Sequence, residues 1–85
     1  MNNNIIELET AQESYEVFDT CYGTVIGSCW QGSFIRLDND EEAFAYAGLI
    51  PGTEVLCTVR RKPRDQRDRT LVSIDSVLTY VPIAA

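Results

Sequence analysis

The chain has 85 residues, 45% of them apolar, and a net charge of −6. This length allows one domain with a modest core, and this composition excludes a globally disordered chain. The sequence contains no histidine, which removes the most common general base, the usual serine and cysteine catalytic pairs and most zinc sites. We therefore expect a single small domain that is not an enzyme and uses no metal or other cofactor.

The sequence also bears on the cellular compartment. No apolar run approaches the length of a membrane span, and the N-terminal residues lack the basic start and apolar stretch of a signal peptide. Three cysteines, an odd number with no C-x-x-C pair, are typical of a protein from a reducing compartment. We expect a cytoplasmic protein that does not insert into membranes.

The N-terminal residues 1–14 are polar and acidic. Thr10 and Glu13 have the spacing of a helix capping box, so this segment forms either a short helix or a frayed arm. We divide the chain into this N-terminal arm, a folded domain over residues 15–80 and a C-terminal tail over residues 81–85.

From Tyr15 onward, residue types alternate as in β-strands. The first predicted strand begins at Tyr15 and ends before a turn at Gln31–Gly32. The second covers residues 33–37, with Phe34 and Arg36 directed outward. A third, over residues 43–47, alternates alanine with aromatic residues, and the pattern does not say which set faces outward; packing is the favoured role for its aromatics.

Two further strands follow a turn that contains Pro51 and Gly52, residues that β-turns favour. They lie over residues 54–60 and 70–75 and alternate strictly on both sides of a polar connection, as an antiparallel pair does. Five strands without a long helix predict an all-β, five-stranded antiparallel OB-fold barrel. The predicted inward residues are Val25, Ile35, Leu37, Val55, Val59, Val72 and Ile74.

Residues 60–69, which comprise the end of the fourth predicted strand and the connection to the fifth, hold six of the seven basic residues of the chain. Asp65 and Asp68 reduce the charge of residues 60–69 to +4, whereas the rest of the chain carries −10. Such a segment is either a solvated hairpin tip or a loop that contacts phosphates, because local potential rather than net charge decides where anions bind.

Four segments of the chain resemble the RNA-binding domain repeated in ribosomal protein S-one. Shared features are a Gly-x-Val first strand, a Gly-x-Phe second strand, a Gly-x-x-Val before the fourth strand and a Leu-Ser-Ile-like fifth strand. The matching segments are Tyr22–Gly27, Gly32–Leu37, Leu49–Val55 and Arg69–Asp75. The resemblance covers about residues 20–77 and implies an OB-fold that binds RNA.

The resemblance also implies binding positions. Phe34 matches a base-stacking aromatic of the second strand, and Trp30 lies one residue before the position, here Gln31, of a second aromatic. The family's third-strand histidine is absent, and Phe44 or Tyr46 is the nearest candidate.

Near the fifth strand, Leu71 stands where the family often has arginine, and Arg69 lies two residues earlier on the same face. The basic connection corresponds to a loop that OB-fold barrels use to bind ligands.

Our first hypothesis is a non-enzymatic domain that binds single-stranded nucleic acid, RNA in preference to DNA. Outward aromatics would stack on bases while cations contact phosphates. The candidate binding residues are Tyr22, Trp30, Phe34, Arg36, Tyr46, Arg60, Arg61, Lys62, Arg64, Arg67 and Arg69.

The second hypothesis is an acidic protein-interaction module or small regulator with no nucleic-acid ligand. The charge of −6 favours it, because acidic groups outside the loop repel a polyanion. Outward aliphatic residues at Ile26, Leu56 and Leu71 favour it too, because an apolar patch on a strand face is typical of a partner surface.

Overall fold

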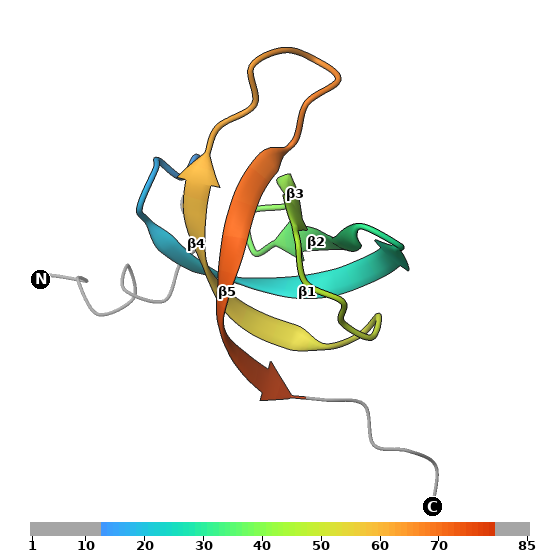
Figure 1. Ribbon diagram of the computed structural model, residues 1–85. Helices are drawn as coiled ribbons and strands as arrows, with labels where there is room; N and C mark the ends of the chain where they lie inside the picture. The colour runs from blue at the N-terminus through green and yellow to red at the C-terminus, as the bar shows by residue number, and fades with distance from the viewer. Residues whose placement is uncertain (1–12, 80–85) are drawn as a thin grey trace, which may run out of the picture.

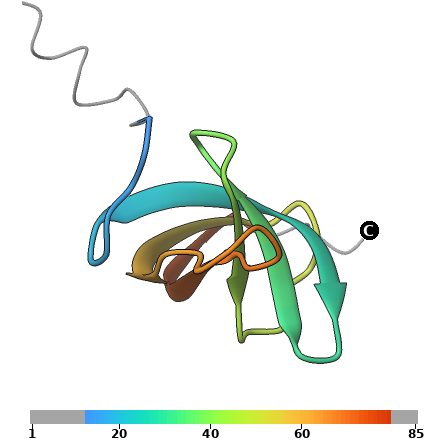
Figure 2. The same ribbon diagram turned by 90° about the horizontal axis from the view of Figure 1, so that it is seen from above.

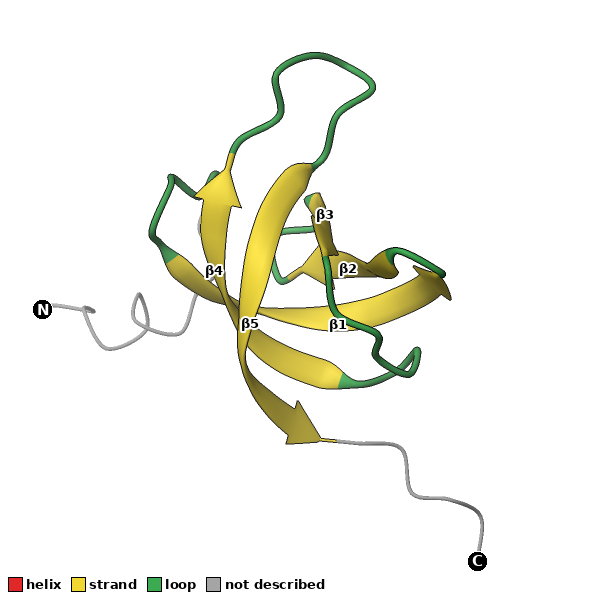
Figure 3. Ribbon diagram, viewed as in Figure 1, coloured by secondary structure: helices red, strands yellow, loops and turns green. Residues whose placement is uncertain are grey.

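A computed structural model describes residues 13–79 of the chain, which form five strands and no helix (Figures 1 and 3). The two predictions for the N-terminal arm, a short helix or a frayed segment, lie almost entirely outside these residues. The strands are β1 Thr20–Cys29, β2 Gly32–Leu37, β3 Glu42–Ala45, β4 Glu54–Arg61 and β5 Thr70–Thr79.

The strands close into a barrel in the order β1-β2-β3-β5-β4, with β4 paired again to β1. The predicted OB-fold barrel is therefore confirmed, with one correction to its strand directions. Four neighbouring pairs are antiparallel, but β3 and β5 are parallel. The reason is geometric, because a closed ring with an odd number of strands cannot alternate direction throughout. β1 is long and curved (Figure 2), which lets it pair with β2 and with β4.

The core consists of the side chains that point into the barrel. Of the seven predicted inward residues, six are buried, and Ile74 is partly buried against them. On β3 the two alanines, Ala43 and Ala45, are buried, so Phe44 and Tyr46 point outward. The small inward residues suit this part of the barrel, because β2 and β3 approach closely there.

The first strand starts later than predicted, at Thr20 rather than Tyr15. A turn precedes it, in which the Asp19 N–H donates to the Glu16 carbonyl at 3.0 Å and Phe18 has a φ of 77°. A positive φ is incompatible with an extended strand, so the alternation before Thr20 is not strand alternation. Tyr15 is nevertheless buried, and its hydroxyl donates to the Asp38 carboxylate.

A β-bulge interrupts β1 where it pairs with β2. Val25 lies opposite Ile35, but Gly27 lies opposite Phe34, so Ile26 is an extra residue on β1. An extra residue shifts the alternation of the strand beyond it. The outward Phe34 therefore has a glycine as its cross-strand neighbour on β1, which leaves space beside its ring.

Two sets of hydrogen bonds fix the chain between β3 and β4. The Thr53 N–H donates to the Ile50 carbonyl at 3.1 Å, with Gly52 at a φ of 95°, so Pro51–Gly52 forms the expected turn, of type II. The Ser33 hydroxyl donates to the Ala47 carbonyl at 2.6 Å and accepts from the Leu49 N–H at 2.9 Å. Ser33 thereby holds the chain segment that carries Tyr46 against β2.

Candidate nucleic-acid interface

A groove with a volume of about 280 Å³ lies on the outer side of β2 and β3. Its walls come from three parts of the chain that are far apart in sequence: the β1–β2 hairpin, the β2–β3 surface and the loop between β4 and β5. This loop extends away from the barrel, as Figure 1 shows in orange. We call this groove of about 280 Å³ the aromatic groove. Its lining residues are Cys29, Gln31, Phe34, Phe44, Tyr46, Arg61, Arg67, Asp68, Arg69 and Leu71.

Three aromatic side chains form a row along this groove. Phe34 and Phe44 lie directly opposite each other on β2 and β3, and their ring centroids are 5.2 Å apart at an interplanar angle of 65°. Phe44 makes a second edge-to-face contact with Tyr46, also at 5.2 Å, at 83°. Such contacts stabilise aromatic pairs beyond their buried area. The row is therefore a packed surface in which each ring orients the next.

The rings differ in how much of them solvent can reach. Phe34 and Phe44 are half-buried, whereas Tyr46 is 73% exposed and Trp30, at the tip of the β1–β2 hairpin, is 91% exposed. The Arg69 guanidinium carbon lies 4.9 Å from the centroid of the Phe34 ring, in a cation–π contact. Tyr46 and Trp30 consequently offer more open ring surface than Phe34 does.

The β4–β5 loop is folded around two of its own acids. Asp68 accepts hydrogen bonds at 3.1 Å from both the Arg61 and the Arg64 guanidinium groups and at 3.0 Å from the Arg64 N–H. These donors, the Arg64 N–H above all, lower the pKa of Asp68 below its usual value. Asp65 accepts from the N–H groups of Arg67 and Asp68. Much of the positive charge of the loop therefore has an internal partner.

Glu41, which precedes β3, ties the loop to the barrel. Its carboxylate accepts a hydrogen bond from the Thr70 hydroxyl and a charged one from Lys62 Nζ at 3.0 Å. Burial alone would raise the pKa of Glu41, but the hydrogen bonds from Thr70, Lys62 and Asn39 outweigh it and lower the pKa. Glu41 is thus ionised at neutral pH and anchors both ends of the loop.

Two cations face the aromatic groove with donor capacity to spare. The Nε–H of Arg61 is buried, and no group within residues 13–79 accepts a hydrogen bond from it. The guanidinium group of Arg67 forms no ion pair with the residues that the structure describes. The Arg61 side chain as a whole is 40% exposed, so its terminal guanidinium nitrogens and those of Arg67 can donate to an acceptor on a ligand, and a phosphate oxygen is suited to this.

The eleven candidate residues divide into three sets. Phe34, Tyr46, Arg61, Arg67 and Arg69 line the aromatic groove, and Trp30 stands next to its lining residues Cys29 and Gln31. Arg60, Lys62 and Arg64 lie at the side of this groove or in the loop, and hydrogen-bond to Ser73, Glu41 and Asp68 respectively. Tyr22 and Arg36 line a different groove, described below.

Asp68 and Phe44, which also line the aromatic groove, are absent from the candidate binding residues, and Phe44 was named only as an alternative to Tyr46. Phe44 lies on the same face of the strand as Tyr46. The sequence could have indicated that this face points outward, because Ala43 and Ala45 on the other face fit a crowded barrel interior better than aromatic residues do. Asp68 had no signal of its own, because its importance depends on where Arg61 and Arg64 fold back.

The aliphatic residues expected to form a partner surface do not lie together in one groove. Ile26 lines the groove that holds Tyr22, Leu71 lines the aromatic groove, and the half-buried Leu56 lines neither.

Residues 13–79 show neither a metal-binding cluster nor a membrane-spanning helix. No cluster of three or more cysteine, aspartate or glutamate side chains there is arranged to hold a metal ion. No helix of this part of the chain is long and apolar enough to cross a membrane.

No protein-family model matches this chain, and no curated protein matches it either. The resemblance to the S-one domain therefore stays a prediction that rests on the four sequence segments named above.

Proposed function

We propose that this protein binds single-stranded nucleic acid, RNA in preference to DNA, in the aromatic groove and without catalysing a reaction. The observation that carries the proposal is that one groove combines the aromatic row of β2 and β3 with cations of the β4–β5 loop. OB-fold barrels that bind oligonucleotides use the face of their second and third strands together with the β1–β2 and β4–β5 loops.

Each part of the groove has a chemical role in the proposal. Tyr46 and Trp30 stack on bases, because their rings are exposed and every base has a face that can stack. Phe44 packs against the Tyr46 ring and Phe34 packs against Phe44, so these two rings orient Tyr46 for stacking. Arg61 and Arg67 donate to phosphate oxygens, since both line the groove, the Arg61 side chain is 40% exposed and Arg67 forms no ion pair with the described residues.

The proposed ligand is single-stranded rather than double-stranded because the aromatic row needs unpaired bases to stack on. A duplex would offer only phosphates to the loop, and much of the charge of the loop is already paired with Asp68 and Glu41. We therefore expect short single strands to bind more tightly than a duplex of the same length.

The test is a salt titration of binding to short fluorescent single strands of RNA and DNA and to a duplex, followed by anisotropy. Two double variants remove the same charge from the loop. Arg61→Ala with Arg67→Ala removes cations that line the groove, whereas Lys62→Ala with Arg64→Ala removes cations that do not. We expect the first pair to reduce the salt slope by about 1.4, the contribution of two phosphate contacts, and the second to reduce it less.

Equal slopes for the two double variants would show that only the overall charge of the loop matters, and would contradict the groove. No measurable binding of any single strand by the native chain would reject the proposal.

A further inference from the structure

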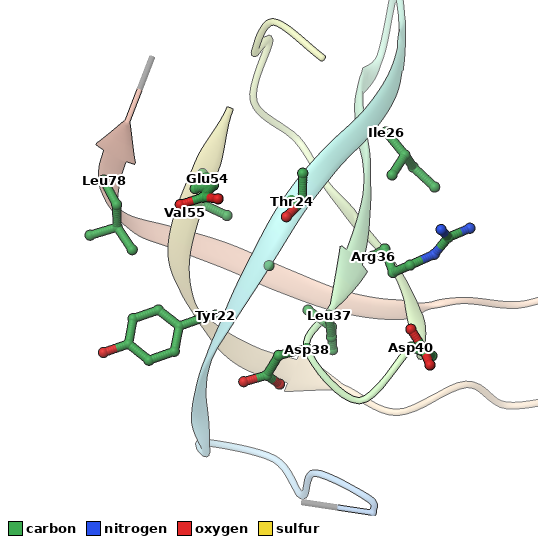
Figure 4. A pocket seen from close by; sticks show the side chains of 11 residues that line it. Tyr22, Thr24, Ile26, Arg36, Leu37, Asp38, Asp40, Glu54, Val55 and Leu78 are labelled. Carbon is green, nitrogen blue, oxygen red and sulfur yellow. The ribbon is translucent and has the colours of Figure 1, made fainter. Parts of the chain in front are cut away.

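A second and larger groove, of about 660 Å³, lies on the outer side of β1. Figure 4 shows it from close by, with Tyr22 and Leu78 toward one end, Ile26 and Arg36 toward the other and Thr24 between them. We call it the β1 groove. Its acidic residues come from two parts of the chain: Asp38 and Asp40 lie in the connection after β2, and Glu54 begins β4.

The β1 groove exposes apolar side chains at both ends. Tyr22 is 58% exposed, and Ile26 and Leu78 are exposed to a similar degree. Exposed apolar side chains scattered singly are ordinary, but several in one groove rimmed by charged residues are typical of an interaction site. None of these three residues has a part in the proposed nucleic-acid contacts.

The charge of the β1 groove is opposite to that of the aromatic groove. Three carboxylates and one guanidinium group, that of Arg36, line it. Phosphates would be repelled by the carboxylates, so nucleic acid is a poor occupant. Lysine or arginine side chains of a partner would be attracted, and the apolar ends of the groove would accept aliphatic side chains.

The backbone around the β1 groove restricts how a partner can bind. Tyr22, Gly23 and Thr24 are paired with β4, and Gly23 and Thr24 are also paired with β2. Val25 lies opposite Ile35 of β2, its N–H donates to the Thr53 carbonyl, and its carbonyl accepts from the Gly52 N–H. A partner therefore cannot add a strand beside these residues, and recognition has to come from side chains.

The spacing of the apolar contacts favours a helix. Tyr22 and Ile26 are separated by roughly 12 Å along β1, which corresponds to about two helical turns. An amphipathic helix presents apolar side chains at this interval on one face, with basic residues beside them.

We propose that the β1 groove binds a basic amphipathic helix of a partner protein. Tyr22, Ile26 and Leu78 contact its apolar face, and Asp38, Asp40 and Glu54 attract its cations. The site is separate from the aromatic groove, so the protein would hold a protein partner on one side of the barrel and a nucleic acid on another. This second site does not depend on the proposed nucleic-acid binding.

The probe is a short fluorescein-labelled peptide of leucine and lysine with all leucines on one face of a helix. A shuffled peptide of the same composition controls for net charge, and a leucine–glutamate peptide reverses the charge. Binding to the full chain is followed by anisotropy, and the contact residues are located from amide chemical shifts. We expect the amphipathic basic peptide to bind most tightly and to shift the amides of Tyr22, Thr24 and Ile26.

The decisive variant is Tyr22→Ser with Ile26→Ser, which changes no charge and replaces two exposed side chains. Its expected effect is a loss of peptide affinity of about tenfold or more, with RNA binding unchanged. Ile50→Ser is the control, because Ile50 is at least as exposed as Tyr22 and Ile26 but lies outside the β1 groove, and this variant should bind the peptide normally.

Several results would overturn this proposal. They are equal binding of the shuffled or acidic peptide, unchanged affinity of the Tyr22→Ser/Ile26→Ser variant, or peptide shifts centred on Phe34 and Phe44. Absence of binding up to the solubility limit of the peptide would do so as well. Concentration-dependent shifts in the β1 groove without peptide would identify a second copy of the chain as the occupant instead. Each of these is independent of whether RNA binds, so the two proposals fail separately.

Discussion

The two grooves use outward residues of neighbouring strands, yet they differ in charge and in how their aromatic side chains are packed. In the aromatic groove the rings of Phe34, Phe44 and Tyr46 contact one another in sequence, and cations surround them. In the β1 groove Tyr22 has no aromatic neighbour among the lining residues, and acids surround it. Phe34 and Arg36 lie only two residues apart on β2 but line different grooves.

This contrast shows how one small barrel separates two surfaces. The β1 bulge places Gly27 beside Phe34 and Ile26 in the other groove, so the outer surface divides along β1. The β4–β5 loop then adds its cations to one side only. Charge segregation of this kind gives a net acidic protein one electropositive groove, because local potential outweighs net charge at short distances.

The largest expected effect comes from Gly32, where β2 and β3 approach most closely beside the aromatic row. A Cβ at this position would lie 2.1 Å from the Ala45 carbonyl oxygen and 2.9 Å from Phe44 Cζ. Backbone has to move to accept it, so Gly32→Ala should lower the free energy of unfolding by about 3 kcal/mol or more, measured by urea denaturation.

Gly48→Ala is the control for this variant, because nothing lies within 4 Å of the added Cβ. Its stability should stay within about 0.5 kcal/mol of the native value. If Gly32→Ala were as stable as Gly48→Ala, β2 and β3 would not approach as closely as described, and Phe44 would not lie beside Gly32.

The barrel core was predictable because strict alternation is the physical consequence of one buried face. Val55 and Val59 are buried as expected, and the residues on either side of them along β4 are half-buried or exposed. The alternation rule fails at Tyr15, which is buried although it precedes a turn and lies on no strand. Alternation also cannot reveal the β1 bulge. A single extra residue reverses parity without leaving a mark in the composition.

The candidate site was predictable only in part, for a different reason. The loop cations are obvious in the sequence, but their partners are not, since Glu41 precedes Lys62 by 21 residues. Tyr22 and Phe34 both point outward, as alternation indicates, but the curvature of a closed barrel directs outward side chains of different strands to different grooves. Pairing and curvature are tertiary properties.

A pair of tyrosine variants tests the separation of the grooves directly. Tyr46→Ala should weaken binding of a short single-stranded RNA by about 1–3 kcal/mol, because it removes the most exposed ring of the aromatic row. Tyr22→Ala removes a similarly exposed tyrosine from the β1 groove and should leave RNA affinity unchanged. Equal losses in both variants would mean that RNA extends across β1 and that the two surfaces are one. Anisotropy titrations with one RNA suffice.

Glu41 is an acid that holds the basic β4–β5 loop beside the aromatic groove, through Lys62 and Thr70. Glu41→Gln should destabilise the protein at neutral pH by about 1 kcal/mol, because the charged acceptor for Thr70 and Lys62 is lost. The pKa of Glu41 is lowered on folding, so its contribution is present above the unfolded-state value of about 4.5 and disappears as pH falls through the lower folded-state value. Urea denaturation should therefore show the difference at pH 7, and a smaller one at pH 3. A difference that grows on acidification would contradict this assignment.

The smallest predicted effect concerns Asp68, which competes with a phosphate for Arg61 and Arg64. Asp68→Asn keeps the side-chain shape but weakens the two ion pairs, so RNA affinity should rise by about two- to threefold and the salt slope should steepen. Asp40→Asn is the matched control: it makes the same change in net charge in the β1 groove, and asparagine tolerates the positive φ of 72° at this position. If long-range repulsion by the acidic body limited RNA binding, both variants would raise affinity equally. If Asp68 instead held the loop in its binding conformation, Asp68→Asn would weaken binding. An increase in affinity for Asp68→Asn alone would establish that Asp68 competes locally with the nucleic acid for Arg61 and Arg64, and that the charge of Asp40 in the β1 groove does not influence RNA binding.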